Sequence, residues 1–408
     1  MTLTGPFKQI LTMDNLPLKG HLSDDQLEII PDGGILHQHG KILEIGKYEQ
    51  LKHKNPDVIL ERIDGEYLVL PGMIDVHTHI CWAGSRINDF AQRLYGKNYL
   101  EIAESGGGIW STVEKTRKAT LIELTELTAQ RAQKLLSQGI TTIEVKSGYG
   151  LSVEDELKIL EAIKLADRNS QVDIISTCLA AHILPTDFDG DENDYLEEMA
   201  KKLLPEIKKK NLSKRIDIFV EKSAFSTFAA RNYLLKAKEM GFEITIHGDQ
   251  FTSGSATLAN EVQALSIDHL EAADDDEIAL LAKGNVIPVV LPGASIGLGQ
   301  PFAPAHKLLN AGTSLVIASD WNPGSAPMGN LLTEASILGT YEKLAMAEVW
   351  AAITCRAAAA LNKTDRGILT AGLKADFIAF KTNDFREIIY RQGDLKPEKV
   401  WKNGVLHH

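Results

Sequence analysis

Two histidines separated by one residue follow a short apolar segment near the start of the chain. They close the string Pro71-Gly72-Met73-Ile74-Asp75-Val76-His77-Thr78-His79. Side chains at positions i and i+2 of a strand point to the same face, so both imidazoles can bind one cation. At the carboxyl end of a barrel strand they would lie where such enzymes carry their chemistry. Taken alone, the pair also fits a surface strand with two chance histidines.

Four later segments are apolar and then end in a single polar group. These groups are His182, His247, His269 and Asp320. One histidine of this kind is more often a core or surface residue than a ligand. Five histidines and an aspartate at the same ends of successive strands would instead converge on one barrel mouth. Three imidazoles and a carboxylate suit a divalent zinc or iron ion.

The elements that must position these groups alternate between strand and helix patterns. A helix is predicted over 120–138, stopped by Gly139, and a second helix begins at Ser152. Strands are predicted at 140–145, 173–179, 217–220, 243–246, 264–267, 286–291 and 314–318. This alternation over about 300 residues favours a parallel (β/α)₈ barrel, a TIM-like α/β fold. An open doubly wound sheet is the alternative, but its glycine-rich nucleotide-binding turn is absent.

Both ends of the chain carry short alternating segments of the kind found in antiparallel sheets. They are 29–30, 35–39 and 40–46, with a turn predicted at Asp32-Gly33-Gly34, and then 367–369, 374–380 and 400–405. Neither end is long enough for a core of its own. We therefore expect one small β-sandwich built from residues 1–66 and 365–408, with the barrel formed by residues 67–364.

Composition limits the classes of partner. The 408 residues carry a net charge of −12, which argues against nucleic-acid binding. Three distant cysteines, Cys81, Cys178 and Cys355, imply no disulfide framework and favour the cytoplasm. No secretory leader and no long uncharged apolar run is present, so no membrane span is expected. The terminal His407 and His408 are left out of the chemistry.

The histidine string, the later histidines and aspartate, and the divided sandwich resemble the metal-dependent amidohydrolase superfamily. Longer strings resemble its imidazolonepropionase family, over nearly the whole chain. They are His77-Thr78-His79 followed by Gly84-Ser85-Arg86; Glu104-Ser105-Gly106-Gly107-Gly108-Ile109; Thr141-Thr142-Ile143-Glu144-Val145-Lys146-Ser147-Gly148-Tyr149-Gly150; and Ser319-Asp320-Trp321-Asn322-Pro323-Gly324-Ser325. The string from Glu144 to Gly150 is the most specific of these.

The resemblance implies a role for each matching residue. His77, His79, His247 and Asp320 match the ligands of one divalent metal ion per chain, zinc or iron. Arg86, Tyr149 and His182 match substrate contacts, and Asn322, Gly324 and Ser325 match a loop that touches substrate or product. The implied reaction is the hydrolysis of 4-imidazolone-5-propanoate to N-formimidoyl-L-glutamate, and the implied assembly is a homodimer. Lys146 is expected to be structural, or to support the metal ligands from behind, rather than to be a carboxylated metal bridge.

The chemistry of the residues agrees with this reaction. A bound metal lowers the pKa of its water from 15.7 toward about 7, which gives a nucleophile for a cyclic amide. Asp320 can hold the proton of that water, and His269 can orient the water or polarise the carbonyl. Arg86 can hold the propionate carboxylate in a bidentate pair. Tyr149 and His182 can donate to ring oxygen or nitrogen.

One position departs from some members of the family. Gln250 stands three residues after His247, where some relatives have glutamate. An amide neither takes up nor releases a proton. We therefore expect His269 or Asp320 to transfer the proton, and Gln250 to hydrogen-bond the substrate. Two alternatives stay open: another enzyme of the superfamily, such as a deaminase or a hydantoinase-like cyclic amide hydrolase, and a non-enzymatic structural or assembly protein of this type. Proteins of the second kind usually lose metal ligands, and the presence of all four here favours an enzyme.

Overall fold

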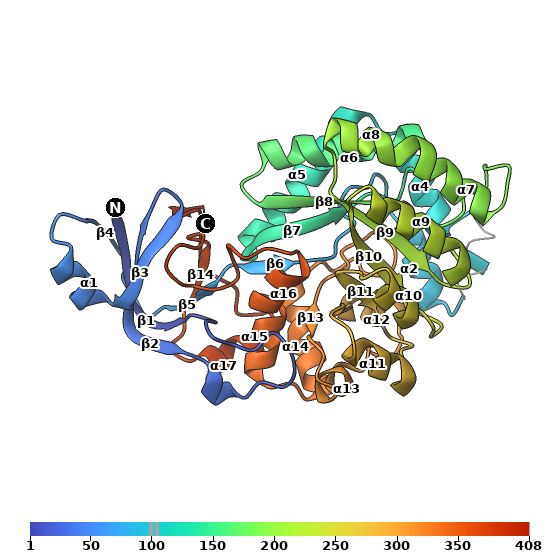
Figure 1. The fold of residues 1–408 in the computed structure, drawn as a ribbon. Helices are drawn as coiled ribbons and strands as arrows, with labels where there is room; N and C mark the ends of the chain where they lie inside the picture. Colours follow the sequence, from blue (N-terminus) through green and yellow to red (C-terminus); the bar gives the residue numbers. More distant parts are fainter. Residues whose placement is uncertain (98–100, 103–105, 408) are drawn as a thin grey trace.

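The computed structural model covers residues 1–408 and describes all of them except 98–100, 103–105 and 408. Glu104 and Ser105 of the sequence strings lie outside the described residues. Two lobes are seen in Figure 1, a small sheet that contains both chain ends and a larger lobe of strands and helices. The expected combination of a barrel and a β-sandwich is confirmed.

The small lobe is built from the two ends of the chain around one sheet. Its strands are β1 (Thr2–Leu11), β2 (Ile29–Gln38), β3 (Lys41–Lys47), β4 (Ile59–Arg62), β5 (Leu68–Pro71), β14 (Phe377–Phe380), β15 (Lys399–Lys402) and β16 (Val405–Leu406). The order is β16-β15-β14-β5-β1-β2-β3, with β4 paired to β1. The chain ends meet where β14 runs antiparallel to β5, with Ile378 opposite Leu70. Phe377 stacks on Trp401 at 4.6 Å in the core of this lobe.

The predicted turn at Asp32-Gly33-Gly34 is wrong, because β2 continues through it. Asp32 takes a left-handed φ of 48°, which bends the strand without ending it. A Cβ on Gly33 would lie 2.6 Å from Ile10 Cδ1, so this glycine lets the Ile10 side chain of β1 pack closely on β2. The segment 367–369 does not form a strand either. The two glycines at 33 and 34 thus serve a close contact between strands and do not reverse the chain.

The large lobe is a parallel barrel of eight strands. They are β6 (Met73–Asp75), β7 (Ile140–Lys146), β8 (Asp173–Ala181), β9 (Arg215–Val220), β10 (Glu243–Gly248), β11 (Ser266–His269), β12 (Ile287–Val290) and β13 (Val316–Ile317), in sequence order around the sheet. A parallel bridge between Thr78 and Trp321 joins the first strand to the last. The seven strands predicted after the histidine pair all occur, and closure excludes the open doubly wound sheet.

Helices cover the outside of the barrel and connect its strands (Figure 1). They are α2 (Ile87–Leu94), α4 (Gly108–Lys118), α5 (Leu121–Ser137), α6 (Val153–Asn169), α7 (Glu192–Glu198), η2 (Met199–Leu203), α8 (Leu204–Lys210), α9 (Thr227–Glu239), α10 (Ala256–Glu261), α11 (Asp275–Ala282), α12 (Pro292–Leu298), α13 (Ala305–Asn310), α14 (Leu331–Glu342), α15 (Met346–Ala352) and α16 (Cys355–Ala360). The small lobe carries η1 (Asp24–Gln26), α1 (Tyr48–Lys54) and α17 (Phe385–Tyr390). Thr120 caps α5 and Ser152 caps α6, which confirms both predicted helix starts.

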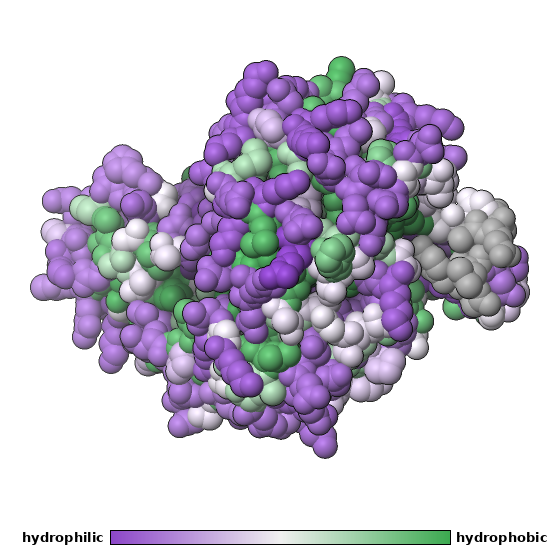
Figure 2. All heavy atoms as spheres, turned by 45° about the vertical axis from the view of Figure 1, so that its right-hand side comes forward, coloured by the Kyte–Doolittle hydropathy of each residue, from purple (hydrophilic) through white to green (hydrophobic). Residues whose placement is uncertain are grey.

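The surface and the helices agree with the composition. On the face shown in Figure 2, hydrophilic residues dominate and apolar ones lie in separate groups. Among the described residues, no helix is long and apolar enough to cross a membrane. The domain limits predicted at 66/67 and 364/365 stay a prediction. The chain passes from the sheet of the small lobe to that of the barrel between Pro71 of β5 and Met73 of β6.

A cluster of charges ties the barrel to the small lobe at the start of β8. Asp173 Oδ2 accepts hydrogen bonds from Arg366 Nη1 at 2.6 Å and Lys402 Nζ at 2.9 Å, and Lys374 contacts the same oxygen. Lys402 is buried and also pairs with Asp376. Burial alone would raise the pKa of Asp173, but the charge of Lys402 and the hydrogen bond from Lys374 outweigh it and lower the pKa to about 2.

We expect Asp173→Asn to lower the free energy of unfolding by about 1.5–3 kcal/mol at pH 7, because three cations lose their shared anion. The pKa of Asp173 is depressed in the folded state, so its contribution is present above its ordinary pKa of 3.8 and is lost as pH falls through about 2. Denaturant unfolding of both proteins should therefore differ at pH 7 and converge near pH 2. Asp394→Asn, in the exposed pair with Arg391, is the control and should change little. A difference that stays constant down to pH 2 would contradict this role of the cluster.

Candidate active site

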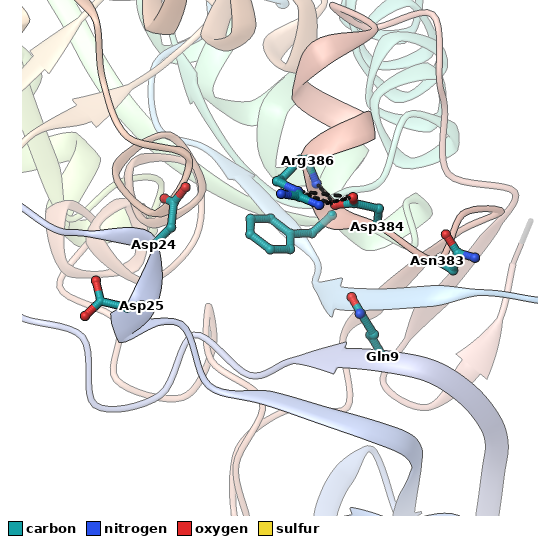
Figure 3. A pocket seen from close by; sticks show the side chains of 7 residues that line it. Gln9, Asp24, Asp25, Asn383, Asp384 and Arg386 are labelled. Atoms are coloured by element: carbon teal, nitrogen blue, oxygen red, sulfur yellow. Dashed lines mark hydrogen bonds and ion pairs between the residues drawn. The ribbon is translucent and has the colours of Figure 1, made fainter.

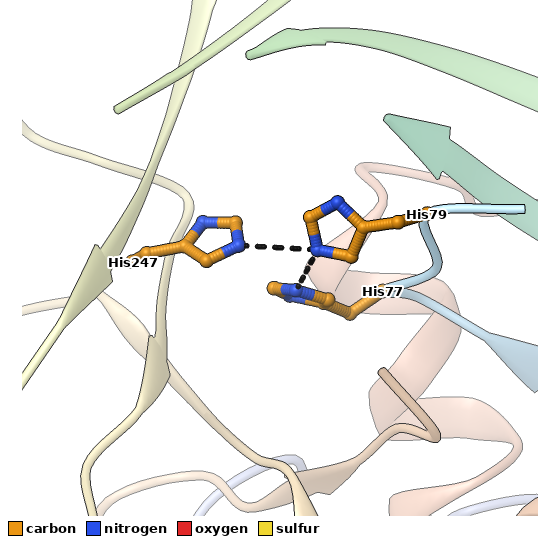
Figure 4. A group of neighbouring side chains, drawn as sticks. All are labelled: His77, His79 and His247. Carbon is orange, nitrogen blue, oxygen red and sulfur yellow. Dashed lines mark hydrogen bonds between the residues drawn. The ribbon is translucent and has the colours of Figure 1, made fainter. Parts of the chain in front are cut away.

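Three of the predicted histidines meet at the carboxyl end of the barrel (Figure 4). Nε2 of His79 lies 3.2 Å from Nε2 of His77 and 3.4 Å from Nε2 of His247. His77 and His79 follow β6, whereas His247 lies near the end of β10. All three side chains are almost completely buried. Each of the three imidazoles thus directs its Nε2 atom toward one common point.

Asp320 joins this group from the last strand. Its Oδ1 lies 3.5 Å from Nε2 of His77 and 3.3 Å from Nε2 of His79. The backbone of Asp320 has a φ of 52°, an unfavourable conformation for a residue with a side chain. Such strain persists where the surroundings hold it, and it is common at functional sites.

Two of the histidines have a carboxylate behind them, on the side away from the point where the three meet. His77 Nδ1 lies 2.6 Å from Asp268 Oδ2, and His247 Nδ1 lies 3.0 Å from Asp217 Oδ2. A carboxylate holds the hydrogen on the nitrogen that it faces, which leaves the Nε2 lone pairs free for a metal. Three imidazole nitrogens and one carboxylate oxygen are a donor set for a divalent transition metal.

Asp217 and Asp268 were missed as functional residues from the sequence. Both lie inside strands, in Arg215–Val220 and Ser266–His269, rather than at the point where a strand ends. The available signal was an acidic residue directly after an isoleucine, at or beside a predicted strand, because a carboxylate buried there requires a polar partner.

His182 and Tyr149 border the histidine group on its β7–β8 side. The ring of His182 stacks on His79 with centroids 5.5 Å apart, and Tyr149 lies 6.0 Å from His79. Burial lowers the pKa of His182 to about 3, with a further contribution from His79, so the ring is neutral. Nδ1 of His182 donates to the carbonyl of Gly148 at 3.0 Å. Its Nε2 therefore carries the free lone pair and would accept a hydrogen bond from a ligand, whereas the sequence suggested a donor.

The loop that carries Tyr149 is fixed by a buried carboxylate of α6. Glu156 accepts from the backbone N–H groups of Gly148, Gly150 and Leu151, at 3.1, 2.7 and 2.9 Å. Gly148 has a φ of 111°, and a Cβ there would lie 2.9 Å from the carbonyl oxygen of Leu179. Glycine is required at this position. Glu156 was also missed, and its signal is a glutamate on the buried face of a predicted helix.

His269 lies beside the group but is not one of the three convergent histidines. Its ring centroid is 5.3 Å from that of His247 and 5.8 Å from that of His77. The residue has a φ of 90°, and its Nδ1 lies 3.4 Å from Glu271 Oε2. His269 is therefore near enough to act on a molecule bound at the three histidines, although it does not belong to that group.

The loop after β13 is organised around Asn322. The Asn322 amide donates to Asp320 Oδ2 at 2.8 Å and to Ser325 Oγ at 2.9 Å. Its oxygen accepts from the N–H groups of Gly324 and Ser325, at 2.7 and 2.8 Å. Asn322 thus holds one oxygen of Asp320, while the other faces the histidines. A substrate contact by Asn322, Gly324 or Ser325 stays a prediction.

Arg86 lies against this loop at a cavity of about 330 Å³. Trp82, Phe90 and Trp321 also line the cavity. Arg86 Nε donates to Asp89 Oδ2 at 2.6 Å, which orients the guanidinium. A Cβ on Gly324 would lie 2.8 Å from Arg86 Nη1, so the guanidinium approaches the loop closely because residue 324 is glycine. The cavity therefore combines aromatic walls with an oriented cation.

Gln250 follows the end of β10, in a loop that Glu221 anchors. Glu221 Oε2 accepts from the N–H groups of Phe251 and Thr252 at 2.9 and 3.1 Å. The side chain of Gln250 is almost buried. This anchoring was not predicted, because Glu221 follows a different strand, β9.

A second cavity, of about 550 Å³, is lined by residues near the two ends of the chain. Gln9, Asp24, Asp25, Asn383, Asp384, Phe385 and Arg386 line it (Figure 3). Arg386 is paired with Asp384, as the dashed lines in the figure show. None of the predicted site residues lines this cavity.

Comparison with known proteins agrees with the fold and the site. The sequence model of the Amidohydrolase family matches residues 68–406, and the chain belongs to this family. Such membership makes the protein a metal-dependent hydrolase. The chain is 40% identical over 386 residues to a protein of Fusobacterium nucleatum named imidazolonepropionase, covering 94% of this chain and 93% of that one. A Bacillus mycoides protein of the same name is 38% identical over 402 residues, covering 98% and 94%.

Solved structures share the fold at low sequence identity. E. coli guanine deaminase superposes with a TM-score of 0.72 at 17% identity, covering 100% of this chain and 99% of that one. An atrazine chlorohydrolase of Arthrobacter aurescens, complexed with zinc, superposes with a TM-score of 0.69 at 15% identity, covering 100% and 95%. These likenesses concern the fold. The family and the histidine group together indicate a divalent metal as the cofactor.

We expect His247→Ala and Asp320→Ala to lose most of the bound metal, because each removes one donor from a set of four. Elemental analysis of purified protein is the measurement, and the unmodified chain should hold about one ion. His182→Ala is the matched control. The His182 ring stacks on His79, but its Nδ1 donates to the carbonyl of Gly148, so this variant should keep its full metal content. Full metal content in both ligand variants would refute this assignment.

Proposed function

We propose that this protein hydrolyses the cyclic amide of 4-imidazolone-5-propanoate to N-formimidoyl-L-glutamate, a step of histidine degradation, with one zinc or iron ion. The observation that carries the proposal is the meeting of three histidines and Asp320, which Asn322 connects to a cavity lined by Arg86. The relatives named imidazolonepropionase, similar over nearly their whole length, support the choice of substrate.

In this proposal His77, His79, His247 and Asp320 hold the ion. When bound, the ion supplies Lewis acidity that brings the pKa of water near neutrality. Asp320 presents Oδ1 to the histidines, whereas Oδ2 is held by Asn322. Its carboxylate is thus oriented and can take up a proton from the attacking water.

The substrate carries an anionic arm and a polar ring, and the site offers a partner for each. Arg86 is oriented by Asp89 toward the aromatic cavity and would bind the propionate carboxylate. Tyr149 is a hydrogen-bond donor, because burial raises the pKa of its hydroxyl and keeps it protonated. Neutral His182 would accept from a ring N–H through Nε2.

Proton transfer is assigned to His269 and Asp320. Gln250 occupies the position where some relatives have glutamate, and its amide transfers no proton. His269 lies within reach of a molecule bound at the histidines and has a carboxylate, Glu271, near its Nδ1. Gln250 would hydrogen-bond the substrate ring.

Three further expectations remain predictions. They are a homodimeric assembly, a cytoplasmic location, and the absence of nucleic-acid partners. A small-molecule substrate follows from the class of enzyme.

The substrate is tested by mixing metal-loaded protein with freshly generated 4-imidazolone-5-propanoate and following the loss of imidazolone absorbance. Arg86→Ala should raise KM with little change in metal content, because losing a charge-assisted pair costs about 1.5–3 kcal/mol. An imidazolone without the acid arm should be a poor substrate for the unmodified enzyme and nearly insensitive to the mutation.

Arg391→Ala is the control for general loss of positive charge, since Arg391 pairs with the exposed Asp394 instead. If Arg86→Ala raised KM equally for both substrates, Arg86 would not bind the propionate arm. No turnover of 4-imidazolone-5-propanoate by metal-loaded protein would overturn the proposed function itself.

Proton transfer gives a separate prediction. His269→Ala should lower kcat by about 10²–10⁴-fold and retain the metal, because a general acid–base group is lost and a ligand is not. Gln250→Ala should act mainly on KM, and Gln250→Glu should be tolerated. Steady-state kinetics with metal analysis of the same samples is the measurement. An almost inactive Gln250→Ala beside a nearly unchanged His269→Ala would reverse the assignment.

A further inference from the structure

A buried lysine lies among the carboxylates behind the histidine group. Lys146 is the last residue of β7, and its side chain is completely buried. Its Nζ donates to Glu144 Oε1 at 2.8 Å and to Asp217 Oδ2 at 2.7 Å, and it lies 3.6 Å from Asp268 Oδ2. The ammonium is therefore bound to carboxylates of three different strands.

Two of these carboxylate oxygens also face a proposed metal ligand. Asp217 Oδ2 lies 2.7 Å from Lys146 Nζ and 3.0 Å from His247 Nδ1. Asp268 Oδ2 lies 3.6 Å from Lys146 Nζ and 2.6 Å from His77 Nδ1. One ammonium thus contacts the oxygen behind each of two histidines that come from different parts of the chain.

The charges explain why a cation is needed there. Three buried carboxylates without a counter-ion would repel one another, and each would lose the hydration that it has in water. The two histidines cannot replace the lysine, because a histidine that binds a metal is neutral. Lys146 is the lysine or arginine that pairs with these carboxylates among the described residues.

We propose that Lys146 is a positioning residue, which holds Asp217 and Asp268 against the far nitrogens of His247 and His77 and thereby raises the metal affinity of the site. The inference rests on the metal ligands of the proposed function but not on its substrate. Carboxylation of Lys146 to bridge two metals does not fit, since it would place a fourth anion among three carboxylates.

The test compares variants that remove the ammonium with and without a change in total charge. Lys146→Met keeps most of the length of the side chain and leaves the three carboxylates without the ammonium. Lys146→Met combined with Glu144→Gln removes one positive and one negative charge, so the net charge of the cluster is unchanged. Glu144→Gln alone is the matched control, because Glu144 touches Lys146 but neither histidine.

The measurements are the Zn²⁺ dissociation constant, from competition with a chromogenic chelator, and the visible absorption of the Co²⁺-loaded protein, with thermal unfolding recorded alongside. Removing a carboxylate–histidine partner typically weakens metal binding 10–100-fold. Both variants that lack Lys146 should fall in this range with an altered Co²⁺ spectrum, and Glu144→Gln should stay within about threefold of the unmodified protein.

A purely structural lysine would lower the unfolding temperature and leave the dissociation constant and spectrum unchanged, which would overturn the proposal. Failure of both Lys146 variants to fold would overturn it too, since Lys146 would then belong to the fold rather than to the metal site. An unmodified protein that binds no Zn²⁺ would instead refute the proposed function, so the two failures are distinguishable.

Discussion

The closure of the barrel between its first and last strands is the constraint on which the site depends. Asp75 accepts hydrogen bonds from the N–H and hydroxyl of Ser319, at 3.1 and 2.5 Å. Just beyond this pair, the N–H of Asp320 donates to the carbonyl of His77 at 3.0 Å, and the N–H of His79 donates to that of Trp321. Residues more than 240 positions apart are thereby held in register, and the carboxylate of Asp320 is delivered to the two histidines.

The same closure links the metal side of the site to its substrate side. Asn322 holds Asp320 Oδ2 with one end of its amide and the backbone of Gly324 with the other. Arg86 lies against Gly324 and reaches the aromatic cavity. The loop after β13 thus contacts both a proposed metal ligand and the cavity that Arg86 lines.

Much of this arrangement could be predicted because parallel barrel strands all end on one face. An apolar run followed by one polar residue was enough to find His247, His269 and Asp320 and to expect them near the histidine pair. Partners inside strands were missed, as for Asp217 and Asp268, because pairing across a barrel depends on register and not on sequence spacing. The acceptor role of His182 was missed for a similar reason, since its tautomer is fixed by the carbonyl of Gly148.

The central claim is that one divalent metal ion binds where the first, fifth and last barrel strands meet, and anomalous X-ray diffraction from crystals of the metal-loaded protein tests it most directly. Data collected on both sides of the zinc or iron absorption edge locate the ion without reference to activity. The account predicts one strong peak per chain, about 2.0–2.2 Å from Nε2 of His77, His79 and His247 and from Oδ1 of Asp320. A peak bound elsewhere, or two peaks bridged at Lys146, would contradict it.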